Sequence, residues 1–341
     1  MNPTGSSTGA SESNLALVGA ASSIGIRPYD EGGQERALGR APAALRELGL
    51  AAALGAVDLG DLRPGPYQDR VRTPGQVRNE AGLVEYSRAL AERVAAATAG
   101  GRKALVIGGD CSIVLGSLLG LRASHRRVGL VYVDAHADFA TPQESTTGSA
   151  ASMCLAMAVG RGDSPLARLH PDGPLVHGAD AVVVARRDQE EWYGQKALAR
   201  HGVLDLTDDE VRRMGFVAAA DRALERVTRE GIEGFWVHLD ADVIDPDLMP
   251  AVDSPVPGGP GIDELVELLI PLAHHPRMLG MQVTIYDPAL DPGFRAGRVL
   301  ASLLERIFGA GQATNPDALH AVNSVAGAPA GSPNRPEDTR G

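Results

Sequence analysis

The stretch Val128–Pro142, VGLVYVDAHADFATP, decides the fold of this chain. It opens with apolar and β-branched residues, a run typical of a buried parallel strand. It then places Asp134, His136 and Asp138 at alternate positions. Alternate residues of an extended chain point to one side, so we expect two carboxylates and an imidazole to converge. Taken alone, so short a motif is also compatible with a loop cap or a surface ion pair.

A second stretch of the same kind favours a metal site. Gly234–Pro246 reads GFWVHLDADVIDP, an apolar strand that ends with Asp240 and Asp242. Two such strands would charge one edge of a sheet heavily, and carboxylates within a few Å of one another cannot all remain ionised. The pair of stretches therefore predicts bound cations at this edge.

Composition narrows the class of protein. The 341 residues are 44% hydrophobic, which is enough apolar material for one large α/β domain or two smaller ones. A net charge of −11 argues against nucleic acid and anionic membranes as partners and favours a small-molecule substrate. The two cysteines, Cys111 and Cys154, do not suggest a disulfide scaffold. We find neither a membrane-spanning apolar run nor a signal peptide, so the expected location is the cytoplasm.

The order of apolar runs predicts an α/β domain over residues 14–310. Residues 1–13 and most of 311–341 are rich in Gly, Ser, Pro and Ala and are expected to be disordered. Between them, strand-like runs alternate with helical patterns such as Asn79–Ala99 and Asp208–Glu230, which predicts a parallel sheet covered on both faces. Ligands bind beyond the carboxyl ends of the strands in such sheets. The predicted strands are Leu15–Ala20, Ala104–Ile107, Val128–Val133, Ala181–Ala185, Phe235–Leu239 and Leu279–Ile285.

Gly108–Ser112, GGDCS, follows one of these strands and opens a helical run. One interpretation is a glycine turn in which Asp110 or Ser112 caps the helix. The segment lacks the Lys and the spacing of a phosphate loop. In another interpretation Cys111 reaches the metal cluster as a thiolate, although a lone buried Cys is usually a small hydrophobe.

Together these blocks resemble the ureohydrolase family of arginases, agmatinases and formiminoglutamases. GGDCS, DAHAD and HLDADVIDPDLMPAVDSPVPGG resemble the family blocks GGDHS, DAHxD and SxDxDxxDPxxxPGxGTPxPGG, and Ala41–Leu50 resembles an early family block. The resemblance spans Leu15 to Phe308. It implies a three-layer α/β/α fold with a central, mostly parallel sheet of about eight strands. It also implies a two-ion Mn²⁺ site at the strand ends and a trimer or hexamer.

The resemblance implies which residues would bind each of the two ions. Asp134 and Asp240 would bridge the two ions. Carboxylates and imidazole suit Mn²⁺, and two ions a few Å apart can lower the pKa of a bridging water, whose proton Asp138 would hold. The other ligands would be Asp138 and Cys111 for one ion, and His136 and Asp242 for the other.

Three departures from the family pattern bear on the substrate. Cys111 stands where the family has His, a softer ligand that would weaken or retune one Mn²⁺ site. Ala151, in Thr147–Ser152, takes the place of a His that shuttles protons in arginases. Ile285, in GMQVTIYDP, takes the place of a Glu that pairs with the substrate guanidinium, which makes ordinary arginine hydrolysis doubtful.

Other residues are candidates for the substrate side of the site. Thr147 and Ser149 are predicted to bind substrate. Glu190, in a segment that resembles the family's RDxD loop, either faces an amino-acid-like ligand or belongs to a solvated acidic loop. His238 precedes Asp240 by two residues, so alternation directs it toward the site in a catalytic or supporting role.

Three hypotheses follow. The first is a metal-dependent hydrolase of linear C–N bonds that acts on a modified amidine, a hydroxyguanidine or a related amide. The second is a conventional arginase or agmatinase whose missing roles are filled from elsewhere in the pocket. The third is a catalytically silent member of the fold, against which the retained ligands argue, because a carboxylate cluster is costly to fold without metal.

Overall fold

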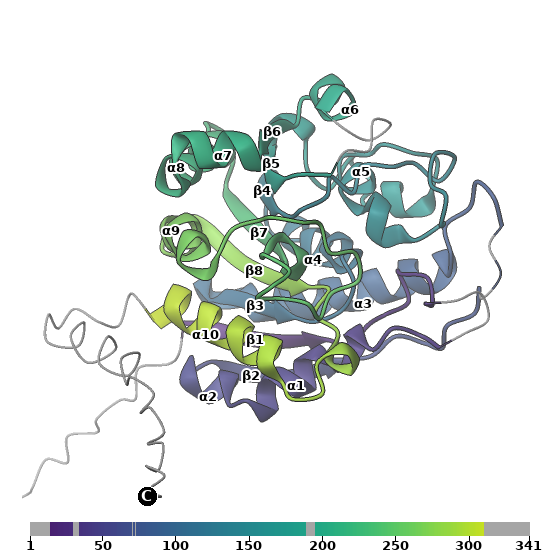
Figure 1. Cartoon of the computed structure of the whole chain (residues 1–341). Coiled ribbons are helices and arrows are strands. Elements are labelled where there is room, and N and C mark those ends of the chain that lie inside the picture. Colours follow the sequence, from purple (N-terminus) through teal and green to yellow (C-terminus); the bar gives the residue numbers. More distant parts are fainter. Residues whose placement is uncertain (1–13, 30–33, 70, 72, 189–194, 310–341) are drawn as a thin grey trace, which may run out of the picture.

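The fold is a single eight-stranded sheet with helices on both faces (Figure 1). The computed structural model describes residues 14–29, 34–69, 71, 73–188 and 195–309. Every strand pair in the sheet is parallel, in the order β2-β1-β3-β8-β7-β4-β5-β6. This confirms the predicted sheet. The strands are β1 (Leu15–Ala20), β2 (Val57–Leu62), β3 (Lys103–Ile107), β4 (Val128–Val133), β5 (Ala181–Arg186), β6 (Leu204–Thr207), β7 (Gly234–Asp240) and β8 (Met278–Thr284).

Six of the eight strands lie where their apolar runs predicted them, within one residue at either end. The sequence analysis missed β2 and β6, which are the two edges of the sheet. Both are largely half-buried or exposed and carry Asp residues, so neither has the continuous apolar run that marked the buried strands.

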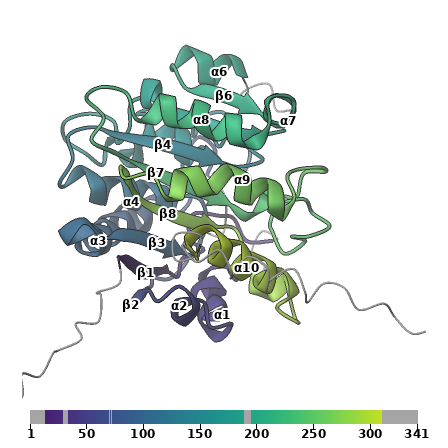
Figure 2. The same cartoon turned by 90° about the vertical axis from the view of Figure 1, so that its left-hand side faces the viewer.

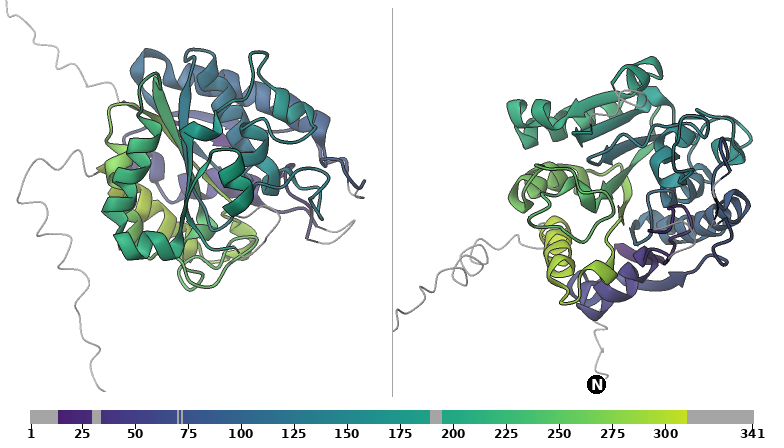
Figure 3. Two further views of the ribbon diagram at one scale, coloured as in Figure 1. Left: turned by 90° about the horizontal axis from the view of Figure 1, so that it is seen from above. Right: turned by 45° about the vertical axis from the view of Figure 1, so that its right-hand side comes forward.

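The helices form a layer on each face of the sheet (Figures 2 and 3). On one face α3 packs against α4, and on the other α9 packs between α8 and α10. The predicted helix over residues 208–230 is two helices, because Gly215, at a positive φ of 90°, ends α7 and begins α8. None of the described helices is long and apolar enough to cross a membrane. The helices are α1 (Ala41–Glu47), α2 (Leu50–Ala53), α3 (Glu80–Thr98), α4 (Ile113–Arg122), α5 (Cys154–Ala158), α6 (Gln195–Arg200), α7 (Asp208–Met214), α8 (Phe216–Val227), α9 (Ile262–Ala273) and α10 (Arg295–Gly309).

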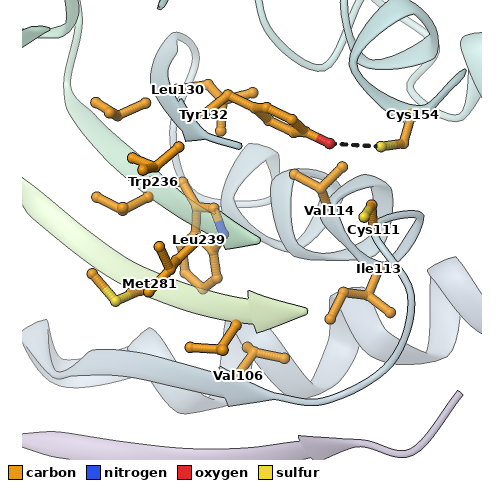
Figure 4. Close-up of a cluster of buried hydrophobic side chains, with 14 of the residues drawn as sticks. Val106, Cys111, Ile113, Val114, Leu130, Tyr132, Cys154, Trp236, Leu239 and Met281 are labelled. Carbon is orange, nitrogen blue, oxygen red and sulfur yellow. Dashed lines mark hydrogen bonds between the residues drawn. The ribbon is translucent and has the colours of Figure 1, made fainter. Parts of the chain in front are cut away.

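The centre of the sheet brings the two acidic stretches side by side. Strands β4 and β7 are neighbours, with Val133 paired to Leu239 at their carboxyl ends. Both strands are buried along their whole length, and Tyr132 and Trp236 are among the largest fully buried side chains (Figure 4). Two segments about a hundred residues apart in sequence therefore deliver their polar residues to one point.

Candidate active site

A pocket of about 780 Å³ opens at the carboxyl ends of β3, β4, β7 and β8. All six of the predicted metal ligands line it. They are Cys111, Asp134, His136, Asp138, Asp240 and Asp242.

Each acidic strand ends in a turn that aims its carboxylates. The Oδ1 atom of Asp134 accepts a hydrogen bond from the backbone N–H of His136 (2.6 Å), and Oδ1 of Asp240 accepts one from that of Asp242 (2.9 Å). The strand β4 ends at Val133, so the residues after it converge through this turn and not through the alternation of an extended chain, as the sequence analysis assumed.

Two groups of side chains that share a residue could each hold a metal ion, because within each group the ligand atoms lie within 4.8 Å of one another. One contains Cys111, Asp134, His238 and Asp240, and the other contains Asp134, His136 and Asp242. Asp134 belongs to both groups, as expected for a bridging ligand. Its Oδ2 atom is buried and has no hydrogen-bond partner among the described residues.

Asp138 lies beside these groups and is held from the opposite side. Its Oδ2 atom accepts a hydrogen bond from the buried hydroxyl of Tyr132 (2.5 Å), and the thiol of Cys154 lies 3.5 Å from the same oxygen. The backbone of Asp138 adopts a positive φ of 47°, a conformation that Asp and Asn tolerate better than most residues. Its assignment as a metal ligand remains a prediction.

Cys111 faces the carboxylates as well as the core. It is 4% exposed, and its Sγ atom lies 2.7 Å from Oδ2 of Asp240. Gly108 and Gly109, at φ of 107° and 77°, make the turn that brings it there from β3. The capping interpretation is wrong, because neither Asp110 nor Ser112 caps α4 through its side chain; the carboxylate of Asp110 accepts instead from the backbone N–H of Ser112, ahead of the helix (3.1 Å).

Burial and mutual repulsion oppose ionisation of the aspartates in the cluster. Burial raises the pKa of Asp138, Asp240 and Asp242, and neighbouring carboxylates raise these pKa values further. Burial opposes ionisation of Asp134 too, but His136 and His238 hold the pKa of Asp134 below its usual value.

Among the described residues, the basic side chains that contact these carboxylates are histidines: Nδ1 of His136 lies 3.0 Å from Oδ2 of Asp242 and 3.5 Å from Oδ1 of Asp134. In the described ranges, no Lys or Arg forms an ion pair with Asp134, Asp138, Asp240 or Asp242. Arg187 lines the pocket, but its guanidinium donates to the backbone carbonyls of Asp242 (2.9 Å), Val243 (3.0 Å) and Val256 (3.1 Å). Oxygen donors and imidazole with no Lys or Arg counter-ion within the described ranges fit divalent metal ions.

The predicted substrate residues are partly placed. Thr147 and Ser149 line the pocket, where Oγ of Ser149 accepts from the backbone N–H of Arg27 (3.0 Å). Glu190 lies outside the described residues. Ala151 and Ile285 also line the pocket, so an apolar wall stands where the family pattern has an imidazole and a carboxylate.

Sequence reasoning missed the polar side chains beneath the cluster. Thr284 donates a hydrogen bond to Oδ2 of Asp240 (3.1 Å), and the ring of Tyr132 stacks on that of His238, with centroids 4.0 Å apart. The hydroxyl groups of Tyr132 and Thr284, each in a predicted central strand, could have indicated these contacts, because a buried hydroxyl needs a hydrogen-bond partner.

Comparison with known proteins identifies the family. The sequence model of the arginase family matches residues 17–309. An arginase from Bacillus caldovelox is 30% identical over 294 residues, which cover 84% of this chain and 97% of that protein. Its solved structure has a TM-score of 0.78 at 26% identity, covering 86% of this chain and 98% of that one.

A more distant structure shares the fold alone. Proclavaminate amidino hydrolase from Streptomyces clavuligerus has a TM-score of 0.66 at 21% identity and covers 86% of this chain and 91% of that one. The family match and the 30% identity across nearly the whole described chain settle the relationship. This chain belongs to the arginase family, whose members are hydrolases of C–N bonds in linear amidines.

Proposed function

We propose that this chain holds two Mn²⁺ ions and hydrolyses the guanidino, hydroxyguanidino or amidine-type carbon of a small amino-acid-like substrate. The observation that carries this proposal is the Oδ2 atom of Asp134. This buried oxygen lies where two groups of ligand atoms overlap, and the part of the chain that the structure describes gives it no hydrogen-bond partner. Such an atom is costly in a folded protein unless a cation is bound to it.

The donor set suits this pair of ions. Asp134 and Asp240 would bridge them, His136 and Asp242 would complete one site, and Asp138 and Cys111 the other. The thiol of Cys111 is the one soft donor, and it weakens the second site for Mn²⁺. When bound, the ions would lower the pKa of a water molecule enough to supply hydroxide, the nucleophile for a trigonal carbon, near neutral pH.

The side chains around the ions would hold and move protons. Burial and the neighbouring charge of Asp134 raise the pKa of Asp138, so this carboxyl group holds a proton more readily than an exposed aspartate does. The hydroxyl of Tyr132 fixes its orientation. Thr147, Ser149 and Glu190 would bind the amino-acid-like part of the substrate.

The pocket favours a reacting group without a full guanidinium charge. Outside the metal cluster, the carboxylates among the described lining residues already have arginine partners, Arg186 for Asp188 (2.6 Å) and Arg36 for Asp253. Ile285 offers only an alkyl surface. A guanidinium cation that enters this pocket would therefore lose water without gaining an ion pair.

A conventional arginase activity is the second candidate, because the relative with 30% identity over most of both chains is named an arginase. In that case the missing roles, including the partner of the guanidinium, would be filled from elsewhere in the pocket.

The test is a panel of guanidino, hydroxyguanidino and amidine amino acids assayed for release of urea or ammonia, with and without Mn²⁺. We expect Mn²⁺-dependent turnover, and faster turnover of a neutral or modified amidine than of arginine. Preference for arginine would favour the second candidate. Tight metal binding without turnover of any compound would indicate a catalytically silent protein.

We also propose that the chain is cytoplasmic and forms a trimer or hexamer. Its two cysteines, Cys111 and Cys154, are free and buried, as is usual in a reducing compartment. Light scattering of the purified protein measures the subunit number, and a monomer would contradict the proposal.

A further inference from the structure

His238 is a buried imidazole that touches the cluster but that the family pattern does not explain. It is 0% exposed, and its Nε2 atom lies 3.7 Å from Oδ2 of Asp134. It stands where the family motif SxDxDxxDP has Ser, while Cys111 stands where the family has its metal-binding His. The simplest interpretation is that His238 binds the metal ion in place of the family histidine that Cys111 has replaced.

The hydrogen bonds behind the ring contradict this reading. The indole Nε1–H of Trp236 donates to Oε1 of Gln282 (3.1 Å), and Nε2 of Gln282 lies 2.8 Å from Nδ1 of His238. An indole nitrogen can only donate. The amide of Gln282 must therefore turn its oxygen to Trp236 and its NH₂ group to His238, because the flipped amide would set two donors against each other.

This arrangement fixes the tautomer of His238. Because Nδ1 accepts a hydrogen bond from Gln282, the single hydrogen of the neutral ring is on Nε2. A histidine that binds a metal through one nitrogen typically donates a hydrogen bond from the other. His238 has the opposite polarity, with its acceptor nitrogen toward the sheet and its N–H toward the cluster.

The N–H of His238 continues a chain of donors that ends on the carboxylates. Its Nε2 atom lies 3.5 Å from Oγ1 of Thr284, which in turn donates to Oδ2 of Asp240 (3.1 Å). The ring cannot easily turn over, because Tyr132 stacks on it with an interplanar angle of 5°. Figure 4 shows how Trp236 and Tyr132 lie in the packed centre of the sheet.

We propose that His238 is a positioning residue and not a metal ligand. Trp236 and Gln282 hold its neutral ring with Nε2–H toward Thr284 and toward the two carboxylates assigned as bridging ligands, Asp134 and Asp240. The serine of the family motif is a hydrogen-bond donor at the same sequence position, so the substitution replaces one donor with another. This inference rests on the metal centre proposed above.

The first test reads the tautomer directly. Protein labelled with ¹⁵N in its histidine rings is studied by long-range ¹H–¹⁵N NMR, both metal-free and loaded with ¹¹³Cd²⁺, and His238 is assigned from the spectrum of His238→Gln. We expect a protonated Nε2 and an unprotonated Nδ1 in both states, with no coupling from cadmium. An unprotonated Nε2, or a ¹¹³Cd coupling at His238, would overturn the proposal.

The second test compares metal affinity in matched variants, measured from the electron paramagnetic resonance of free Mn²⁺. Gln at position 238 keeps an N–H donor but offers no imidazole, so His238→Gln should bind Mn²⁺ within about tenfold of the unmodified protein. His136→Gln makes the same change at an assigned ligand and should lose about a hundredfold or more. Equal losses in the two variants would identify His238 as a ligand.

The two proposals fail in different ways. If the unmodified protein binds neither Mn²⁺ nor Cd²⁺, the proposed function is wrong. The tautomer measured in the metal-free protein then still decides whether Trp236 and Gln282 orient the ring as the hydrogen bonds indicate.

Discussion

The substitution Asp240→Asn should stabilise the metal-free protein at alkaline pH, although it removes an assigned metal ligand. Asp240 is 1% exposed, and a carboxylate oxygen of Asp134 lies within 4.8 Å of its own. At an effective dielectric constant of about 20, two charges at this distance repel by about 3 kcal/mol. The asparagine oxygen can still accept from the backbone N–H of Asp242 (2.9 Å). Its amide can donate to Thr284, which has a second acceptor in the carbonyl of Leu239 (3.5 Å).

The effect should depend on pH with a defined sign. Burial, Asp242 and Asp134 raise the pKa of Asp240, so the folded chain retains a proton that the unfolded chain releases near pH 4. The stability linked to that proton is complete below about pH 4 and is lost as the pH rises through the folded-state pKa. The asparagine variant has no such loss. We expect the variant to gain about 1–3 kcal/mol in free energy of unfolding at pH 8, less than the full repulsion because Asp240 of the unmodified protein can relieve part of it by taking up a proton. At pH 4 we expect little difference between the two proteins.

Urea unfolding of protein treated with a chelator measures the gain, and repeating it with Mn²⁺ measures the contribution of metal. The unmodified protein should gain about 2.7 kcal/mol at a hundred times its Kd for Mn²⁺, and the variant much less. Asp180→Asn is the matched control, since this buried carboxylate is paired with Arg127 (2.6 Å) and Arg229 (2.8 Å) and its loss should destabilise the protein. The reasoning is refuted if Asp240→Asn destabilises the metal-free protein at pH 8, or if Mn²⁺ stabilises it as much as the unmodified protein.

Three further substitutions test other parts of the site, and a fourth tests the packing of the sheet beneath it. Asp134→Ala should abolish metal loading and activity, and full occupancy in a metal analysis would refute its assignment. Cys111→His should tighten Mn²⁺ binding and remove the sulfur charge-transfer absorption of the Co²⁺ form. If neither value changes, Cys111 is a buried core residue and not a metal ligand. Ile285→Glu should raise kcat/KM for guanidinium substrates about tenfold or more, and an unchanged ratio of arginine to neutral-amidine turnover would contradict this. Gly280→Ala should lower the free energy of unfolding by about 1–3 kcal/mol, because the added Cβ would overlap the backbone carbonyl of Ala104 in β3 and the ring of Trp236; a wild-type urea midpoint would show that β3 and β8 can move apart to admit it.

The central strands could be predicted from sequence because each is buried on both faces and is therefore largely apolar. The edge strands β2 and β6 could not, because an edge strand meets solvent and its composition resembles that of a loop. The break between α7 and α8 was missed for a related reason. Apolar residues keep their helical spacing across Gly215, and only the positive φ of that residue separates the two helices.

The sequence by itself determined which side chains are the proposed metal ligands, since Asp134, His136, Asp240 and Asp242 occur in short segments whose turns are local. Tertiary structure decided which of these atoms meet, because β4 and β7 become neighbours only in the folded sheet. It also decided how the ring of His238 is held, on which its proposed role rests. The residues that orient its ring come from β7 and β8, and the residue that stacks on it comes from β4. The direction of a hydrogen bond depends on which donor faces which acceptor across strands, and that pairing exists only after the chain has folded.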